Sequence, residues 1–215
     1  MSNNQIAAAV ASITQNVNWE RKGLDLQAII EAGNRGELGG PLTDWLASKG
    51  WTKVVQALYT RLISGTEVIT LNPTDGMETI AKAGSLFTGG IDSDFANYGC
   101  DVVVPATGKQ NVAVREMIMN GTFAQIFGEL GKLDDLCLTQ AQIIQFVKSH
   151  RKWLRKDGYA TFFLFKIGNE FFVARVSFAD DGRLEVGVRH LSDDYVWYAG
   201  SQHRMVVPQL TLAKS

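Results

Sequence analysis

A dense group of positive charges occupies residues 148–156, at the end of a predicted helix. Its basic members are Lys148, His150, Arg151, Lys152, Arg155 and Lys156. Cations stabilise a helix C-terminus by about 0.3–1 kcal/mol each, so dipole complementarity is one interpretation of this run. The alternative is a face that contacts phosphates, with Trp153 and Tyr159 as stacking groups. The candidate binding residues are therefore Lys148, Arg151, Lys152, Trp153, Arg155 and Tyr159.

Other residues that commonly do chemistry fit no known motif. His150, His190 and His203 form neither H-x-x-x-H nor H-E-x-x-H, and the sequence lacks G-K-[ST] and G-x-S-x-G. Asp92 and Asp94 lie two residues apart without the glycine and glutamate of a calcium loop, so they are interpreted as turn formers. We predict no catalytic residue, metal ligand or cofactor. A small hydrolase using histidine and a carboxylate is the third hypothesis.

Aromatic residues are concentrated between Tyr159 and Tyr198, where the sequence predicts strands. Adjacent side chains of a strand point to opposite faces of its sheet. The pairs Phe162–Phe163 and Phe171–Phe172 therefore place rings on both faces of a hairpin. Either both faces are buried within the fold, or one face binds a protein or single-stranded nucleic acid.

Apolar spacing and turn residues predict the elements that must position these side chains. Helices are predicted over 4–16, 24–32, 41–46, 51–63, 77–83, 112–119, 122–130 and 140–155. Strands are predicted over 66–71, 101–104, 159–167, 170–178, 184–189, 195–198 and 205–207. Thr139 and Gln142 have the spacing of a capping box. Gly168-Asn169 is a candidate two-residue hairpin turn.

These elements together predict an α+β fold. N-terminal helices would pack with a C-terminal antiparallel meander of four to five strands, which could curl into a small open barrel. Residues 1–137 form a mainly helical portion with an irregular middle, and residues 138–215 form a helix plus an antiparallel β module. A single compact domain is the alternative, because the glycine-rich stretch 33–40 is short for a linker.

Composition indicates an ordinary globular protein. The 215 residues are 46% hydrophobic and 20% charged, with a net charge of −1. Residues 1–137 carry 10 Lys and Arg against 15 Asp and Glu, and residues 138–215 carry 11 against 7. No apolar stretch approaches the length of a membrane span, and the N-terminus lacks the basic region of a signal peptide. With Cys100 and Cys137 interpreted as free thiols, we predict a cytoplasmic protein without a membrane partner.

Several short segments of the sequence carry a resemblance to other proteins. They are Thr-Phe-Ala-Gln-Ile-Phe-Gly at 122–128, Leu-Cys-Leu-Thr-Gln at 136–140, Asp-Gly-Tyr at 157–159 with Phe-Phe-Leu-Phe-Lys at 162–166, and His-Arg at 203–204 with Val-Val-Pro-Gln at 206–209. These segments resemble an uncharacterised group of bacterial hypothetical proteins of candidate-phylum type. The resemblance covers the C-terminal half to two-thirds of the chain. It implies a bacterial, cytoplasmic protein and no particular activity or cofactor.

The leading functional hypothesis is a non-enzymatic binding or structural-interaction protein. Its contact surface would combine the aromatic strands with the basic helix end, and its partner would be another protein. The alternative is an accessory protein that binds nucleic acid through the same residues.

Joint replacement of Arg151, Lys152 and Arg155 by glutamine separates these two hypotheses. If the chain binds nucleic acid, its salt-dependent affinity for oligonucleotides disappears in the variant, because phosphate neutralisation is lost. Fluorescence anisotropy at low and physiological salt measures this affinity. Oligonucleotide binding that is unchanged in the variant would contradict the assignment of these residues.

Overall fold

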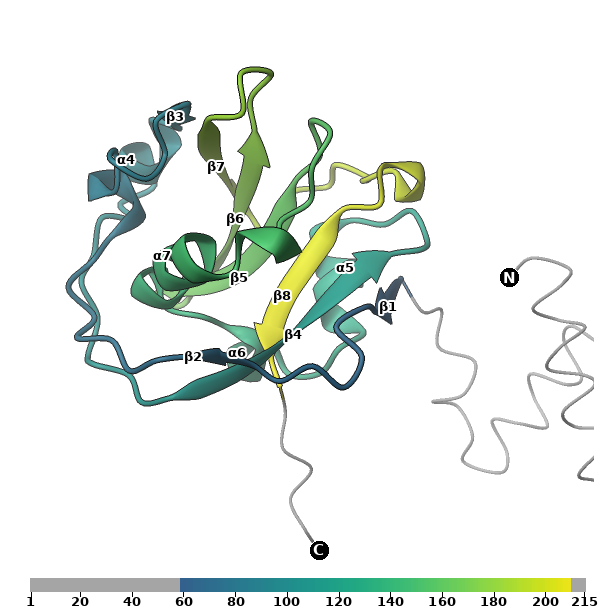
Figure 1. Ribbon diagram of the computed structural model, residues 1–215, viewed down its shortest axis with the longest axis horizontal. Coiled ribbons are helices and arrows are strands. Elements are labelled where there is room, and N and C mark those ends of the chain that lie inside the picture. The colour runs from purple at the N-terminus through teal and green to yellow at the C-terminus, as the bar shows by residue number, and fades with distance from the viewer. Residues whose placement is uncertain (1–58, 210–215) are drawn as a thin grey trace, which may run out of the picture. The chain divides into compact units, whose positions relative to one another are not determined.

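The computed structural model describes residues 59–209, which build one mixed sheet of eight strands (Figure 1). The strands are β1 (Thr60–Leu62), β2 (Ile69–Leu71), β3 (Gly90–Ile91), β4 (Gln110–Met117), β5 (Thr161–Ile167), β6 (Glu170–Phe178), β7 (Leu184–His190) and β8 (Arg204–Pro208). Their order is β1-β4-β8-β5-β6-β7-β3, with β2 also paired to β4. The pairs β5–β8 and β3–β7 are parallel, and the other pairs are antiparallel.

Short helices connect and cover these strands. They are the α-helices α4 (Asp94–Asn97), α5 (Phe123–Gly128), α6 (Leu133–Leu136) and α7 (Gln140–Ser149), and the 3-10 helices η3 (Ile80–Lys82), η4 (Arg151–Trp153) and η5 (Ala199–Ser201). In Figure 1, α7 lies over one face of the sheet and α5 over the other. Within residues 59–209, no helix is long and apolar enough to cross a lipid bilayer.

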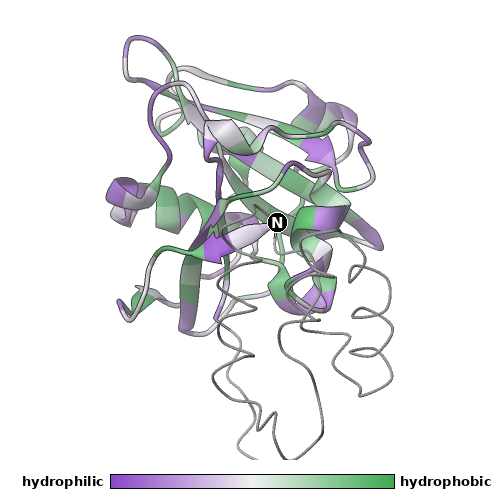
Figure 2. Cartoon of the chain, turned by 90° about the vertical axis from the view of Figure 1, so that its right-hand side faces the viewer, coloured by the Kyte–Doolittle hydropathy of each residue, from purple (hydrophilic) through white to green (hydrophobic). Residues whose placement is uncertain are grey.

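The central strand β5 is buried on both faces. Phe163 and Phe165 belong to the core beneath α7, where Phe146 packs edge-on against Phe163 at a ring-centroid distance of 5.5 Å. Phe162 and Leu164 belong to a second core on the opposite face, beneath α5 and α6. Figure 2 shows hydrophobic residues along the central strands and hydrophilic ones in many of the loops. Both faces of the predicted hairpin are therefore buried over most of β5 and the middle of β6.

The predicted α+β fold is wrong for the described residues. These residues form mostly sheet, and the sheet is mixed rather than an antiparallel meander. Its two ends are not paired with each other, so it does not form the predicted small barrel. The helices predicted over 4–16, 24–32 and 41–46, and the start of the one over 51–63, lie outside the described residues. The C-terminal end of the helix predicted over 51–63 is wrong, because Thr60–Leu62 forms β1 and pairs with β4.

The helix predicted over 112–119 is also wrong, because residues 112–117 belong to β4. Val112 and Val114 point to the core beneath α7, and Met117 belongs to the opposite core. This alternation matches a strand, whose backbone groups pair with β8 on one side and with β1 and β2 on the other. No strand forms over 101–104. In the predicted strand 195–198, only an isolated bridge between Gly121 and Trp197 occurs.

Local signals of capping and turns correctly predict the start of α7 and the β5–β6 hairpin. In α7, Gln142 N donates to Thr139 Oγ1 at 3.2 Å, and Thr139 N donates to Gln142 Oε1 at 2.9 Å, which completes the capping box. The helix ends at Ser149 rather than at residue 155, and η4 follows. The hairpin β5–β6 is confirmed, and Gly168 in its turn has a φ of 58°. Strands from both sides of residue 137 share the sheet.

A buried glutamine ties α7 to the irregular segment between β2 and β4. Gln140 is 3% exposed; its Oε1 accepts a hydrogen bond from Ile80 N at 2.9 Å, and its Nε2 donates to Cys100 O at 2.6 Å. One side chain therefore satisfies two backbone groups of a segment that has little regular structure of its own.

We predict that Gln140→Ala lowers the free energy of unfolding by about 2–4 kcal/mol, because two backbone groups lose their partner. The matched control is Gln110→Ala, since within residues 59–209 the hydrogen bond of the Gln110 side-chain amide goes to the neighbouring Asn111 carbonyl. Urea denaturation measures both variants. An equal loss in both would show that Gln140 does not hold this segment.

Candidate aromatic–arginine binding site

A loop between β7 and β8 carries a tryptophan to the face of the sheet beneath α5. Trp197 N donates to Gly121 O at 2.9 Å, and Gly121 N donates to Trp197 O at 3.2 Å. Asn120 Oδ1 accepts a further hydrogen bond from Ala199 N at 2.8 Å. Gly121 is required here, because a Cβ at this position would lie 2.6 Å from the Tyr59 ring. The loop is thus fixed against the connection between β4 and α5.

The Trp197 indole joins the core to the surface. Its ring centroid lies 5.0 Å from Phe123 and 4.8 Å from Phe162, both of which are fully buried. It lies 5.1 Å from His203 and 4.9 Å from Tyr195, which is 60% exposed. Aromatic pairs at such distances add to the energy of simple area burial. The buried rings therefore hold the indole in place.

His203 is a buried member of this group. Its Nδ1 accepts a hydrogen bond from Ala160 N at 3.1 Å, and its ring stacks on Phe162 at 4.9 Å. Burial, with smaller contributions from the nearby charges of Arg175 and Arg155, lowers the pKa of His203 to about 4. The imidazole is therefore neutral at physiological pH and serves as a packing group.

Two arginines flank these rings. The Arg175 guanidinium lies over the Trp197 ring, with Cζ 5.1 Å from the ring centroid. The Arg155 guanidinium lies 5.3 Å from the centroid of Tyr159, whose ring packs edge-on against His203. We call this group the aromatic–arginine cluster. Its members are Arg155, Tyr159, Arg175, Tyr195, Trp197 and His203.

Large apolar side chains project from the same loop into solvent. Tyr195, Val196 and Tyr198 are 60%, 56% and 67% exposed. We call these three residues the apolar tip. A folded protein gains nothing from exposing three such neighbours in water, so the tip is a candidate contact surface.

The structure divides the residues of the predicted basic site between two places. Lys148 Nζ lies 2.6 Å from Glu78 Oε1, and Lys152 Nζ lies 2.7 Å from Glu67 Oε1. The hydrogen bond from Lys152 lowers the pKa of Glu67. These two cations are thus already paired with carboxylates of the segment between β1 and η3.

The remaining predicted residues lie in or near η4. Trp153 packs against the core beneath α7, with Lys152 Nζ 5.5 Å from its ring centroid, and Arg151 is exposed. Arg155 Nη1 is 3.2 Å from Asp157 Oδ2. Arg155 and Tyr159 are the two predicted residues that the fold brings to the aromatic–arginine cluster.

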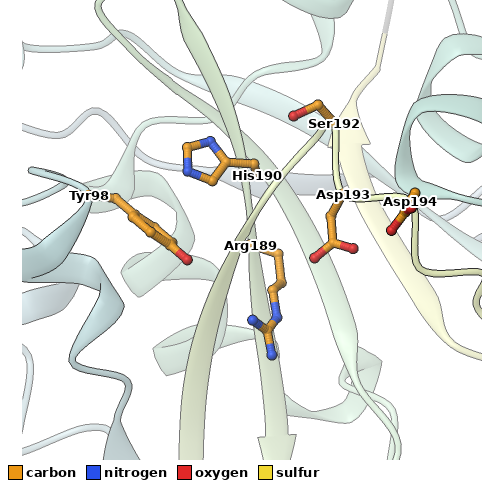
Figure 3. Close-up of a pocket in the computed structure, with 6 residues that line it drawn as sticks. All are labelled: Tyr98, Arg189, His190, Ser192, Asp193 and Asp194. Carbon is orange, nitrogen blue, oxygen red and sulfur yellow. The ribbon is translucent and has the colours of Figure 1, made fainter.

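The three histidines lie in separate environments. His150 Nε2 is 3.3 Å from Thr70 O, and His203 is buried in the aromatic–arginine cluster. His190 lines a shallow hollow of about 380 Å³ with Tyr98, Arg189, Ser192, Asp193 and Asp194. Figure 3 shows its imidazole turned toward Tyr98, at a ring-centroid distance of 4.5 Å. Between residues 59 and 209, no histidine side chain is hydrogen-bonded to a carboxylate.

Metal and thiol chemistry find little support in the described part of the chain. No group of three His, Cys, Asp or Glu side chains there is arranged to hold a metal ion. Cys100 and Cys137 are free, and burial raises their pKa values to about 11 and about 12. Both thiols are therefore protonated at neutral pH, which makes them poor nucleophiles.

Arg175 lies outside the basic run of residues 148–156, so that pattern does not reveal it. A signal for it exists: Arg175 is the one charged residue in the otherwise apolar run Phe171–Val176. Its position alternates with Phe171 and Val173, so the sequence pattern already places it on a face that is otherwise buried.

No protein-family model, curated protein or solved structure matches this chain significantly. Any functional conclusion therefore depends on the geometry of the site itself.

Acid should weaken the fold through His203. Because the folded-state pKa of about 4 lies below the unfolded value of 6.5, the unfolded chain binds more protons in between. The contribution of neutral His203 to the free energy of unfolding is therefore fully present above pH 6.5. It is lost as the pH falls toward 4, by about 3 kcal/mol in total. The variant His203→Asn keeps an acceptor for Ala160 N but does not titrate.

Urea unfolding at several pH values compares the two proteins. We expect the wild type to lose more stability than His203→Asn between pH 6.5 and 4. Parallel losses in both proteins would mean that His203 is not held in its neutral form by the fold.

Proposed function

We propose that this protein is a non-enzymatic binding protein whose contact surface is the apolar tip together with the aromatic–arginine cluster. The observation that carries the proposal is the exposure of Tyr195, Val196 and Tyr198 beside a half-buried Trp197. Tyrosine, tryptophan and arginine are the residues that most often dominate the binding energy of protein interfaces.

The rigidity of the loop supports this proposal. Hydrogen bonds from Trp197 and Ala199 fix its backbone to residues 120–121, and the buried Phe123 and Phe162 fix the indole. A surface that is already ordered loses less conformational entropy when a partner binds. The apolar tip is therefore presented in a form ready for contact.

The charges near the surface favour a protein over a nucleic acid as the partner. Lys148, Lys152 and Arg155 each have a carboxylate within 3.2 Å, so these cations are partly neutralised within the fold. Glu185, Asp193 and Asp194 lie near the arginines of β6 and β7. A surface of mixed charge attracts the phosphate backbone weakly, because affinity for nucleic acid grows with the number of phosphates neutralised.

With this function we propose a cytoplasmic setting in a bacterium, as the sequence predicts. The two free thiols, Cys100 and Cys137, support a reducing compartment.

Peptide selection tests the proposed surface. Peptides selected from a random library on the full chain should bind the double variant Tyr195→Ala/Tyr198→Ala roughly tenfold more weakly. The matched control is Met77→Ala/Val103→Ala, which also removes two exposed apolar side chains. Isothermal titration calorimetry measures all three proteins.

Two outcomes would overturn the proposal. One is that the selected peptides bind the tip variant as tightly as the wild type. The other is that oligonucleotides bind at low salt with an affinity that depends on Arg151, Lys152 and Arg155, which would favour a nucleic-acid partner.

A further inference from the structure

Within residues 59–209, the partly buried Arg175 guanidinium has no hydrogen-bond acceptor. Its Nε is fully buried and unpaired, and among residues 59–209 no carboxylate oxygen lies within 4.0 Å of its nitrogens. Leaving a buried charged donor unpaired costs more than leaving a neutral one unpaired. Such a group calls for an explanation, and one explanation is a ligand that supplies the acceptor.

Two carboxylates, Asp92 and Glu185, are close enough for their charges to act on Arg175, and one oxygen of each is hydrogen-bonded elsewhere. Glu185 Oε1 accepts a hydrogen bond from Ser177 Oγ at 2.9 Å, and Asp92 Oδ1 accepts one from Asp94 N at 3.1 Å. Gly187 lies between Asp92 and Arg175: a Cβ there would be 3.4 Å from Asp92 Oδ2 and 4.0 Å from Arg175 Cζ. The two acids thus flank the guanidinium without pairing with it.

The surroundings of Arg175 define what it can bind. The Trp197 ring packs against the guanidinium, and the Trp197 Nε1 donor is also buried and unpaired. Burial lowers the pKa of Arg175, because it disfavours the charged form. The positive charge of Arg189, on the neighbouring strand β7, lowers this pKa further. An incoming anion would relieve the repulsion between the two guanidinium groups.

We propose that Arg175, seated on Trp197 and assisted by Arg189, binds a carboxylate of the protein partner, presented beside a large apolar side chain that packs on Tyr195. This inference rests on the proposed function, and it names the chemistry of the partner. A planar guanidinium group can donate two parallel hydrogen bonds to the two oxygens of one carboxylate. The flanking Asp92 and Glu185 favour a singly charged carboxylate over a doubly charged phosphate.

Nuclear magnetic resonance of the full chain tests the site directly. The reporters are the Nε–H signal of Arg175 and the indole N–H signal of Trp197. The probe is N-acetyl-glutamic acid N-methylamide, whose only charge is the side-chain carboxylate. The matched uncharged probe is the glutamine analogue, and inorganic phosphate forms a separate arm, all at constant ionic strength.

We expect the glutamate probe to shift both reporters saturably and the glutamine analogue to leave them unmoved. Arg175→Gln should weaken the shift of the Trp197 signal roughly tenfold, and Arg175→Lys should weaken it less, because it keeps the charge but loses the fork. Lys109→Gln, which removes an exposed cation outside both the basic run and the aromatic–arginine cluster, should change nothing.

Three results would overturn the carboxylate site. They are reporters that respond no more to the glutamate probe than to its glutamine analogue, a response to phosphate alone, and a response that persists in Arg175→Gln. None of these depends on Tyr195 or Tyr198 binding a peptide. The two tests can therefore give different answers. Peptide binding that depends on Tyr195 and Tyr198, without a response to the glutamate probe, would overturn this inference alone. A response to the probe without such peptide binding would overturn the proposed function alone.

Discussion

The whole structure depends on covering both faces of the hairpin β5–β6. Successive phenylalanines, Phe162 with Phe163 and Phe171 with Phe172, place large rings on opposite sides of the same strands. Water must be excluded from both sides, because each exposed ring would forfeit the free energy gained by burial. Helix α7 covers one face, and α5, α6 and the loop that carries Trp197 cover the other.

This constraint also explains why the site lies where it does. Trp197 completes the core over Phe162, so the loop around it must approach the sheet, and its neighbours Tyr195, Val196 and Tyr198 are left facing solvent. The same face carries Arg175, the one charged residue of the run Phe171–Val176. Core packing and surface chemistry therefore meet at one indole, with buried rings beneath it and a guanidinium beside it.

Sequence reasoning succeeded where the signal was local. Both the capping box of α7 and the β5–β6 turn depend on residues within a few positions of each other. It failed at β4, because Val112 and Val114 occur in a segment whose identity is set by pairing with β8, far away in sequence. For the site, sequence reasoning identified Arg155 and Tyr159 but not Arg175. The role of Arg175 depends on its contact with Trp197, which is distant in the sequence. The basic run misled because Glu67 and Glu78, which pair with its lysines, come from distant parts of the chain.

We propose that a partner protein binds the surface around Trp197. A crystal structure of the full chain with a peptide selected on it tests this claim most directly. Our account predicts a peptide that packs on Tyr195 and places a carboxylate oxygen about 2.7–2.9 Å from an Arg175 nitrogen. A peptide seated instead along Lys148 and Lys152, away from Trp197, would contradict it.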